Sequence, residues 1–251
     1  MSDVIETIAD PDAPSVEAAG DDVTDADLDA LAAFDTPTIC NALELTNPER
    51  RGHGFTLSPF AVLHPDQAPI VGYARTARIR AAQPDLAERG RLPYYEYMAA
   101  TDGEGGARKI VVIEDVDPHP GVGAFWGEVH TAVHLGLGCL GCVTSGSFRD
   151  VEDSAEGFQL LGGSVGPSHA FVHPVEWGTP VTVHGMTVSH GDIVHADRHG
   201  AVVVPRDAVG RIPEAVALIQ RREAKLLEAA RRPDFGIEAL KAALGEAADI
   251  H

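Results

Sequence analysis

The sequence has little positive charge and little cysteine. Its 251 residues include 19 Lys and Arg against 38 Asp and Glu, a formal net charge of −19. Nucleic acids and anionic membranes are bound through basic surfaces, so we expect neither as a partner. Three cysteines are too few for a disulfide scaffold and indicate a reducing, cytoplasmic compartment. No apolar run approaches the roughly 20 residues of a membrane span, and residues 1–20 lack the basic start and apolar run of a signal peptide.

The remaining composition predicts a globular domain with an acidic tail. Hydrophobic residues make up 44% and charged residues 23% of the chain, ordinary values for a soluble protein. Residues 1–30 contain ten acidic and no basic side chains, whereas the rest of the chain has 28 acidic and 19 basic ones. We therefore predict a disordered acidic tail over residues 1–23, an α/β domain over 24–231 and a C-terminal extension over 232–251.

The hydrophobic pattern predicts an α/β fold with a β-rich second half. Short β-branched runs predict buried strands in the first half, and helical segments follow them. We expect strands at 70–77, 109–114 and 139–144, helical stretches at 84–101 and 126–136, and a helix over 150–161. Five short strands with Gly and Pro turns are expected at 170–175, 181–183, 186–188, 193–195 and 201–204.

Helices are expected to flank this domain in the sequence. Between Thr24 and Leu45 the pattern predicts helices with N-caps at Thr24 and Thr36, with Pro37 in a first turn. Residues 207–231 predict an amphipathic helix whose apolar stripe faces the core or a partner.

Candidate functional groups concentrate between residues 127 and 150. A predicted helix N-terminus at Gly127-Glu128-Val129-His130 is followed by a buried strand, a Gly turn and the pair Arg149-Asp150. Open α/β folds bind ligands at the carboxyl ends of strands and at helix N-termini. A guanidinium at such a place can hold a carboxylate through two hydrogen bonds, and a neighbouring carboxylate can hold a hard divalent cation.

Nearby histidines and cysteines leave further interpretations open. His130 and Glu128 are candidates for acid–base catalysis because they adjoin the anion-binding turn. His130 and His134 share a helix face and precede Cys139 and Cys142, a set that could form a His₂Cys₂ zinc site. We prefer to interpret both cysteines as buried apolar side chains, since residues three apart on a strand point to opposite faces.

These motifs resemble those of the RraA-like family (regulator of ribonuclease activity A), which includes the class II 4-hydroxy-4-methyl-2-oxoglutarate aldolases. The resemblance covers about residues 30–230. Ser145 and Asn41 stand where many members have Asp, which indicates a divergent subgroup with a different substrate or a shifted base. The matching residues, in chain order, are Thr38, Ala42, Leu43, Gly127, Glu128, Ala132, Gly138, Gly141, Gly146, Arg149, Asp150, Gly185, Gly191, Asp192, Asp197, Gly200 and Pro205.

The resemblance implies a compact swivelling-domain fold, an αββα sandwich, assembled as a homotrimer or a dimer of trimers with sites between subunits. It implies that Asp150 binds Mg²⁺ or Mn²⁺ and that Arg149 contacts the keto and carboxylate oxygens of a pyruvyl group. The amides of Gly127, Glu128 and Val129 would bind the carboxylate of that group.

The activity implied by this resemblance is that of a metal-dependent lyase acting on a 2-oxo acid. It would release pyruvate by retro-aldol cleavage or decarboxylate oxaloacetate, with the metal and the arginine stabilising the pyruvate enolate. The family also implies an alternative, a non-catalytic regulator that binds a protein such as a ribonuclease. In that case the acidic tail would mimic nucleic acid toward a basic partner.

Overall fold

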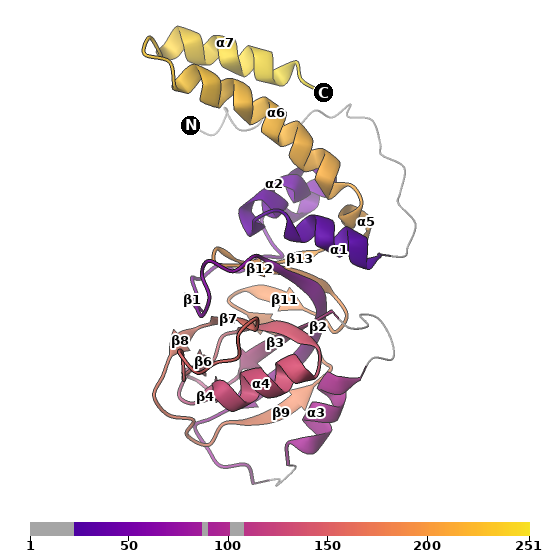
Figure 1. Ribbon diagram of the computed structural model, residues 1–251, viewed down its shortest axis with the longest axis vertical. Coiled ribbons are helices and arrows are strands. Elements are labelled where there is room, and N and C mark those ends of the chain that lie inside the picture. The colour runs from indigo at the N-terminus through magenta and orange to yellow at the C-terminus, as the bar shows by residue number, and fades with distance from the viewer. Residues whose placement is uncertain (1–22, 87–89, 101–107) are drawn as a thin grey trace.

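The computed structural model describes residues 23–86, 90–100 and 108–251. The tail expected over residues 1–23 lies, apart from its last residue, outside the described residues. The described chain has a mixed α/β fold around a sheet that curls into a half-barrel (Figure 1). Within the described residues this sheet has eight strands in the order β1-β7-β5-β3-β2-β12-β13, with β9 paired to β2.

The strands of the main sheet come from both halves of the chain. They are β1 (Ala61–Val62), β2 (Ile70–Arg80), β3 (Lys109–Asp115), β5 (Cys139–Thr144), β7 (Gln159–Gly162), β9 (His173–Trp177), β12 (Ile193–Asp197) and β13 (Gly200–Val204). Two smaller sheets accompany it. One is parallel and contains β4 (Ala124–Trp126), β6 (Ser147–Phe148) and β8 (Ser164–Val165); the other pairs β10 (Val181–Val183) with β11 (Met186–Val188).

The long strand β2 organises the sheet. One of its edges pairs in parallel with β3, and the other pairs with β12 through its first half and with β9 through its second half. The strand extends beyond its predicted end at residue 77, because its last residues pair with β9 and the polar side chain of Arg78 finds charged partners there. Arg78 forms ion pairs there with Glu114 at 3.0 Å and with Glu176 at 2.6 Å.

β3 separates two cores. Val111 and Ile113 point into the core that also holds α3 (Leu92–Ala99), and Ile110 and Val112 point into the core on the other face. This alternation follows from the two-residue period of a strand. It explains why a continuous apolar run predicted β3 correctly.

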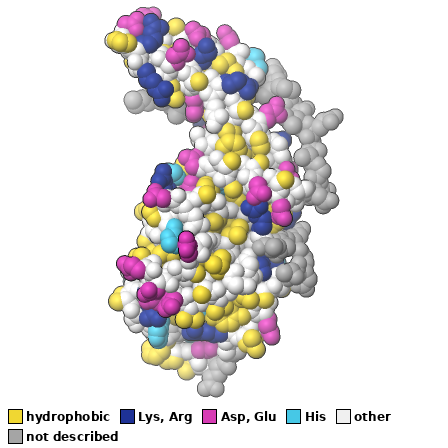
Figure 2. All heavy atoms as spheres, in the orientation of Figure 1, with side chains coloured by type: hydrophobic (Ala, Val, Ile, Leu, Met, Phe, Trp, Pro, Cys, Tyr) yellow, Lys and Arg dark blue, Asp and Glu magenta, His cyan; other side chains and the backbone are white. Residues whose placement is uncertain are grey.

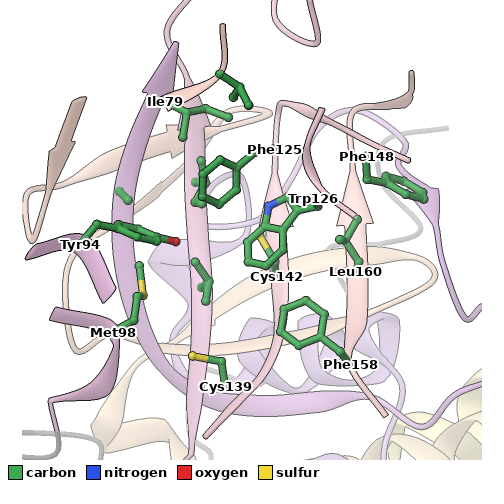
Figure 3. Packing of buried hydrophobic residues seen from close by; sticks show 14 of the residues in the cluster. Ile79, Tyr94, Met98, Phe125, Trp126, Cys139, Cys142, Phe148, Phe158 and Leu160 are labelled. Carbon is green, nitrogen blue, oxygen red and sulfur yellow. The ribbon is translucent and has the colours of Figure 1, made fainter. Parts of the chain in front are cut away.

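A β-bulge in β5 changes the direction of its side chains. Cys139 and Gly141 pair with consecutive residues of β3, so Leu140 is an extra residue in the ladder. As a result Cys139 and Cys142 both point into the same core (Figure 3). The expectation that they face opposite sides is therefore wrong, whereas their burial is confirmed.

Two N-terminal helices cover a third core beside β12 and β13. Thr24 caps α1 (Asp25–Ala32), and the reciprocal bond from the Thr24 amide to Asp27 completes a capping box. α2 (Thr36–Thr46) is capped by Asp35 and not, as predicted, by Thr36. The Thr36 amide instead donates to Asp197 Oδ2 at 2.9 Å, which ties α2 to β12.

The C-terminal helices extend away from the domain. The helix predicted over 207–231 is divided into α5 (Arg206–Val209) and α6 (Ile212–Ala230). Only the first turns of α6 are buried in the third core; α7 (Ile237–Ala248) then packs back along α6, and the pair projects from the body (Figure 1). Among the described helices, none combines the length and the apolar composition needed to cross a bilayer.

The described surface has no continuous basic patch on the face that Figure 2 shows. Lys and Arg side chains lie scattered among Asp and Glu along the body and the projecting helices. This distribution agrees with the acidic net charge of −19.

The helix expected over residues 150–161 is absent from the described structure. Asp150 has a φ of +52° and Gly157 a φ of +86°, and an α-helix contains neither value. Turns follow instead, closed by the bond from the Asp153 amide to the Asp150 carbonyl at 3.1 Å, and the chain then enters β7. This turn sets the position of Asp150.

Candidate active site

A cavity of about 330 Å³ lies where β4 leads into α4 (Glu128–Gly136) and where the chain leaves β6. Six of its lining residues belong to the motif identified in the sequence between residues 127 and 150, and five do not. The former are Gly127, Glu128, Val129, His130, Arg149 and Asp150; the latter are Arg91, Ala124, Phe125, His169 and Val172. The cavity therefore gathers every residue proposed from the sequence for binding the substrate or Mg²⁺ or Mn²⁺.

Strand pairing brings these residues together. β4 and β6 are parallel neighbours, and the Arg149 amide donates to the Trp126 carbonyl at 3.0 Å. Gly127 and Arg149 consequently leave the same edge of the small sheet, the edge at which α/β folds bind ligands.

Arg149 and Asp150 lie side by side at the cavity wall. Arg149 Nε is 3.4 Å from Asp150 Oδ2, and the two side chains are 39% and 35% exposed. The Glu128 amide donates to the same Asp150 oxygen at 3.4 Å. Both contacts are long, so they orient the carboxylate toward the N-terminus of α4 without enclosing it.

Gly127 provides the space for this approach. A Cβ at this position would lie 2.5 Å from Asp150 Oδ2 and 3.3 Å from Arg149 Cγ. The backbone of Gly127 is extended, with a φ of −176°. Glycine is therefore required here by the proximity of Asp150 and not by backbone conformation.

His130 is held as a neutral side chain on the cavity floor. Arg91 donates to Nε2 at 3.2 Å, so the proton of the neutral ring is assigned to Nδ1, which lies 3.3 Å from the Tyr95 hydroxyl. Burial, together with His134, Arg91 and Arg149, lowers the pKa of His130 to about 3. Both ring nitrogens are thus occupied by contacts within the fold.

His134 anchors the same helix one turn later. Its Nδ1 donates to the His130 carbonyl at 2.6 Å, and its Nε2 accepts from the buried Tyr94 hydroxyl at 2.8 Å. Burial lowers the pKa of His134 to about 4. Phe125 and Trp126 pack against both histidine rings, so an aromatic cluster holds α4 in place. Figure 3 shows Tyr94, Phe125 and Trp126 of this cluster in the core.

The first turn of α4 faces the cavity with polar groups. The Glu128 side chain is exposed and has no hydrogen bond or ion pair to any residue that the structure describes. The amides of the first turn have no acceptor within the helix; the Glu128 amide makes its long bond to Asp150, and the others can meet an anion. Val129 itself is 67% exposed and presents an apolar side chain at the rim.

The alternative zinc site does not assemble. Cys139 and Cys142 lie in the core, where burial raises the pKa of Cys139 to about 11, and zinc requires thiolates. Both nitrogens of His134 are hydrogen-bonded inside the fold. The described residues contain no group of three or more His, Cys, Asp or Glu side chains arranged around a metal position.

The two departures from the family pattern lie away from the cavity. Ser145 Oγ accepts a hydrogen bond from the Asp115 amide at 2.9 Å, so it supports the end of β3. Asn41 is exposed on α2. Neither residue belongs to the cavity lining.

Arg91 is a site residue that the sequence did not indicate. It directly precedes α3, and its guanidinium donates to His130 Nε2 and to the Val172 carbonyl, the latter at 3.1 Å. No local motif distinguishes it, because Arg91 and His130 are 39 positions apart in the sequence and only the tertiary fold brings them together.

The fold and the site define a class: an α/β protein with a polar cavity at the carboxyl ends of parallel strands and a helix N-terminus. The model of the RraA-like family (Aldolase/RraA) matches residues 29–203, and the chain belongs to this family. A curated relative, protein DlpA of Legionella pneumophila, is 26% identical over 109 residues, which are 40% of this chain and 17% of DlpA. The match thus spans about a sixth of that protein.

Two solved structures show the same fold. An uncharacterized protein from Pseudomonas syringae pv. tomato superposes with a TM-score of 0.66 at 21% identity, covering 93% of this chain and 100% of the other. RraAS2 of Streptomyces coelicolor, described as an unusual member of the RNase ES inhibitor RraA protein family, has a TM-score of 0.61 at 21% identity. That match covers 84% of this chain and 98% of RraAS2.

Proposed function

We propose that the protein is a divalent-metal-dependent lyase that cleaves a 2-oxo acid to give pyruvate. The reaction would be retro-aldol cleavage of a 4-hydroxy-2-oxoglutarate type of substrate or decarboxylation of oxaloacetate. The observation that carries this proposal is the open pair Arg149 and Asp150 beside the N-terminus of α4, on a cavity large enough for a small acid.

The donor set suits Mg²⁺ or Mn²⁺ better than a softer metal. Asp150 offers one half-exposed carboxylate, and Glu128 offers a second at the rim. Mg²⁺ is commonly held by one or two carboxylates together with water and substrate oxygens. Asp150 would hold the metal, which when bound supplies Lewis-acid stabilisation of the negative charge that develops on the keto oxygen.

The remaining roles belong to the protein. Arg149 would hydrogen-bond the keto and carboxylate oxygens of the pyruvyl group, and its charge would stabilise the enolate as it forms. The amides of Gly127, Glu128 and Val129 would bind the carboxylate at the positive end of α4, with the Glu128 amide exchanging its long bond to Asp150 for the ligand. We assign the proton transfer to Glu128, since its exposed carboxylate has no described partner, and we assign His130 to positioning.

We also propose that copies of the chain associate as a trimer or a dimer of trimers. α4 supports this assembly because Val129, at the cavity rim, and Val133, one turn later on the same face, are exposed apolar residues. Such a patch is typical of a protein interface. Light scattering coupled to size exclusion would test it, and a monomer at micromolar concentration would contradict it.

The proposed activity is tested by measuring pyruvate release from oxaloacetate and from 4-hydroxy-4-methyl-2-oxoglutarate, with Mg²⁺ and with EDTA. We expect turnover that EDTA removes and added Mg²⁺ restores. Replacement of Arg149 by Met should lower kcat/KM by about 100-fold or more, the effect of losing one oxyanion donor. Arg198→Met, which removes an exposed arginine outside the cavity, is the matched control.

Absence of metal-dependent turnover on a panel of 2-oxo acids would overturn the lyase proposal. The regulator hypothesis would then take its place, and co-purification with a ribonuclease would support it.

A further inference from the structure

Arg91 separates two adjoining cavities. The Arg149–Asp150 cavity shares Arg91, His169 and Val172 with a second cavity of about 450 Å³, which is lined by the segment just before α3 and by residues 169–174. The Arg91 side chain reaches across from the start of α3 to α4 and to the Val172 carbonyl. It therefore lies at the end of the active-site cavity that leads into the second one.

The guanidinium of Arg91 is fixed but not neutralised. Its five N–H groups make described contacts with His130, with the Val172 carbonyl and with the Tyr95 hydroxyl, all of them uncharged partners. No carboxylate of a described residue lies within ion-pair distance of it, unlike Arg149, which is paired with Asp150. A buried cation without a counter-ion is unfavourable, but Arg91 is exposed to the cleft and can meet an anion there.

His130 makes this placement possible. Its Nε2 lies 3.2 Å from the Arg91 guanidinium and accepts a hydrogen bond from it, so the ring lends a lone pair to the arginine. The Tyr95 hydroxyl in turn fixes the orientation of the ring. The arrangement thus holds a positive charge in one place before a ligand arrives, which reduces the entropy lost on binding.

The cavity then has two arginines facing a single ligand. Arg149 and the first turn of α4 serve one end, and Arg91 serves the other. Two carboxylates, from Asp150 and Glu128, balance these two charges, so a bound divalent cation would leave the site with two positive charges. A dianion is the ligand that neutralises it.

We propose that Arg91 binds the second carboxylate of the substrate and makes the enzyme selective for 2-oxo dicarboxylic acids over 2-oxo monocarboxylic acids. The inference rests on the proposed lyase function, since it assumes that Arg149 receives the pyruvyl end. Arg91 forms no bond to the reacting atoms and acts by binding and orientation.

A matched pair of substrates tests this role. 4-Hydroxy-4-methyl-2-oxoglutarate and 4-hydroxy-4-methyl-2-oxopentanoate differ only in a carboxylate or a methyl group at the far end. In Arg91→Met we expect kcat/KM for the dicarboxylate to fall by about 10- to 100-fold, as for removal of one partner of a charged hydrogen-bonded pair. The monocarboxylate should change by less than about threefold, because it has no group for Arg91 to bind.

Two variants separate charge from structure. Arg91→Lys keeps the charge but not the planar fork, and should retain much of the preference. Arg198→Met removes one exposed positive charge outside the cavity and should leave the preference unchanged. An equal loss for both substrates in Arg91→Met would overturn the inference, since it would mean that Arg91 only supports the fold.

Calorimetry distinguishes failure of this inference from failure of the lyase proposal. Binding of 2-oxoglutarate and of pyruvate is measured for the wild type and for Arg91→Met in the presence of Mg²⁺. Weaker binding of 2-oxoglutarate alone in the variant supports the role of Arg91 even where no cleavage is observed. Binding of 2-oxoglutarate that does not depend on Arg91 overturns it, even where cleavage is robust.

Discussion

Replacement of Gly127 by Ala should disable the site while leaving the fold intact. The added methyl would lie 2.5 Å from Asp150 Oδ2. Because carbon and oxygen atoms in ordinary contact are about 3.5 Å apart, the carboxylate must retreat by about 1 Å. The displaced atom is the end of a side chain, and the extended backbone at Gly127 accepts any residue, so the strain falls on the site and not on the fold.

The expected loss follows from this displacement. A misplacement of about 1 Å in a catalytic group reduces the rate by about 100-fold, or about 2.7 kcal/mol of transition-state stabilisation. Affinity for the metal should fall by about 10-fold or more, since groups that orient a metal ligand have effects of that size. The melting temperature should change by only a few degrees.

The assay combines pyruvate release, a Mn²⁺ titration followed by electron paramagnetic resonance, and thermal unfolding. Gly136→Ala is the matched control: it lies at the end of the same helix, and a Cβ there meets no atom within 4 Å. That variant should keep full activity and be slightly more stable, because alanine is the better helix former. Gly127→Ala with wild-type activity and Mn²⁺ affinity would refute the placement of Asp150 as the metal ligand.

Three further predictions follow from the same region. Asp150→Asn should abolish metal-dependent turnover yet melt close to the wild type, since asparagine tolerates the φ of +52°. Asp150→Ala should be about 1 kcal/mol less stable than Asp150→Asn, because alanine does not tolerate this φ. Equal melting temperatures of the two variants would contradict this explanation. Tyr94→Phe removes the donor to buried His134 Nε2 and should destabilise the protein by about 1–3 kcal/mol in urea unfolding. Because burial lowers the pKa of His134 to about 4, the unfolded chain binds more protons between pH 6.5 and 4. The contribution of His134 to stability should therefore be complete above pH 6.5 and fall on acidification by about 1.4 kcal/mol per pH unit. His134→Gln should reduce that slope, and an unchanged slope would contradict the assignment.

Elements with strong local signals were predictable from the sequence. The strand β5 begins at Cys139 and ends at Thr144 as its apolar run predicted, and Thr24 caps α1 as its hydroxyl and the following acidic residues predicted. The active-site motif was predictable for the same reason, because the strand, the Gly turn and Arg149-Asp150 are close together in the sequence. Parallel strands in turn place their carboxyl ends at one edge of a sheet, where ligands bind.

The tertiary structure decided what depends on distant partners. The bulge at Leu140 exists because of how β5 pairs with β3, and it turns both cysteines into one core. The helix predicted after residue 150 gave way to a turn, since the chain must cross from β6 back to β7 and Asp150 adopts a positive φ there. Arg91 lies 39 positions before His130 in the sequence, and its neighbours in the site are set by packing. The local sequence pattern thus determined the strands and the motif. Contacts between residues that are distant in the sequence determined the shape and the charge of the cavity.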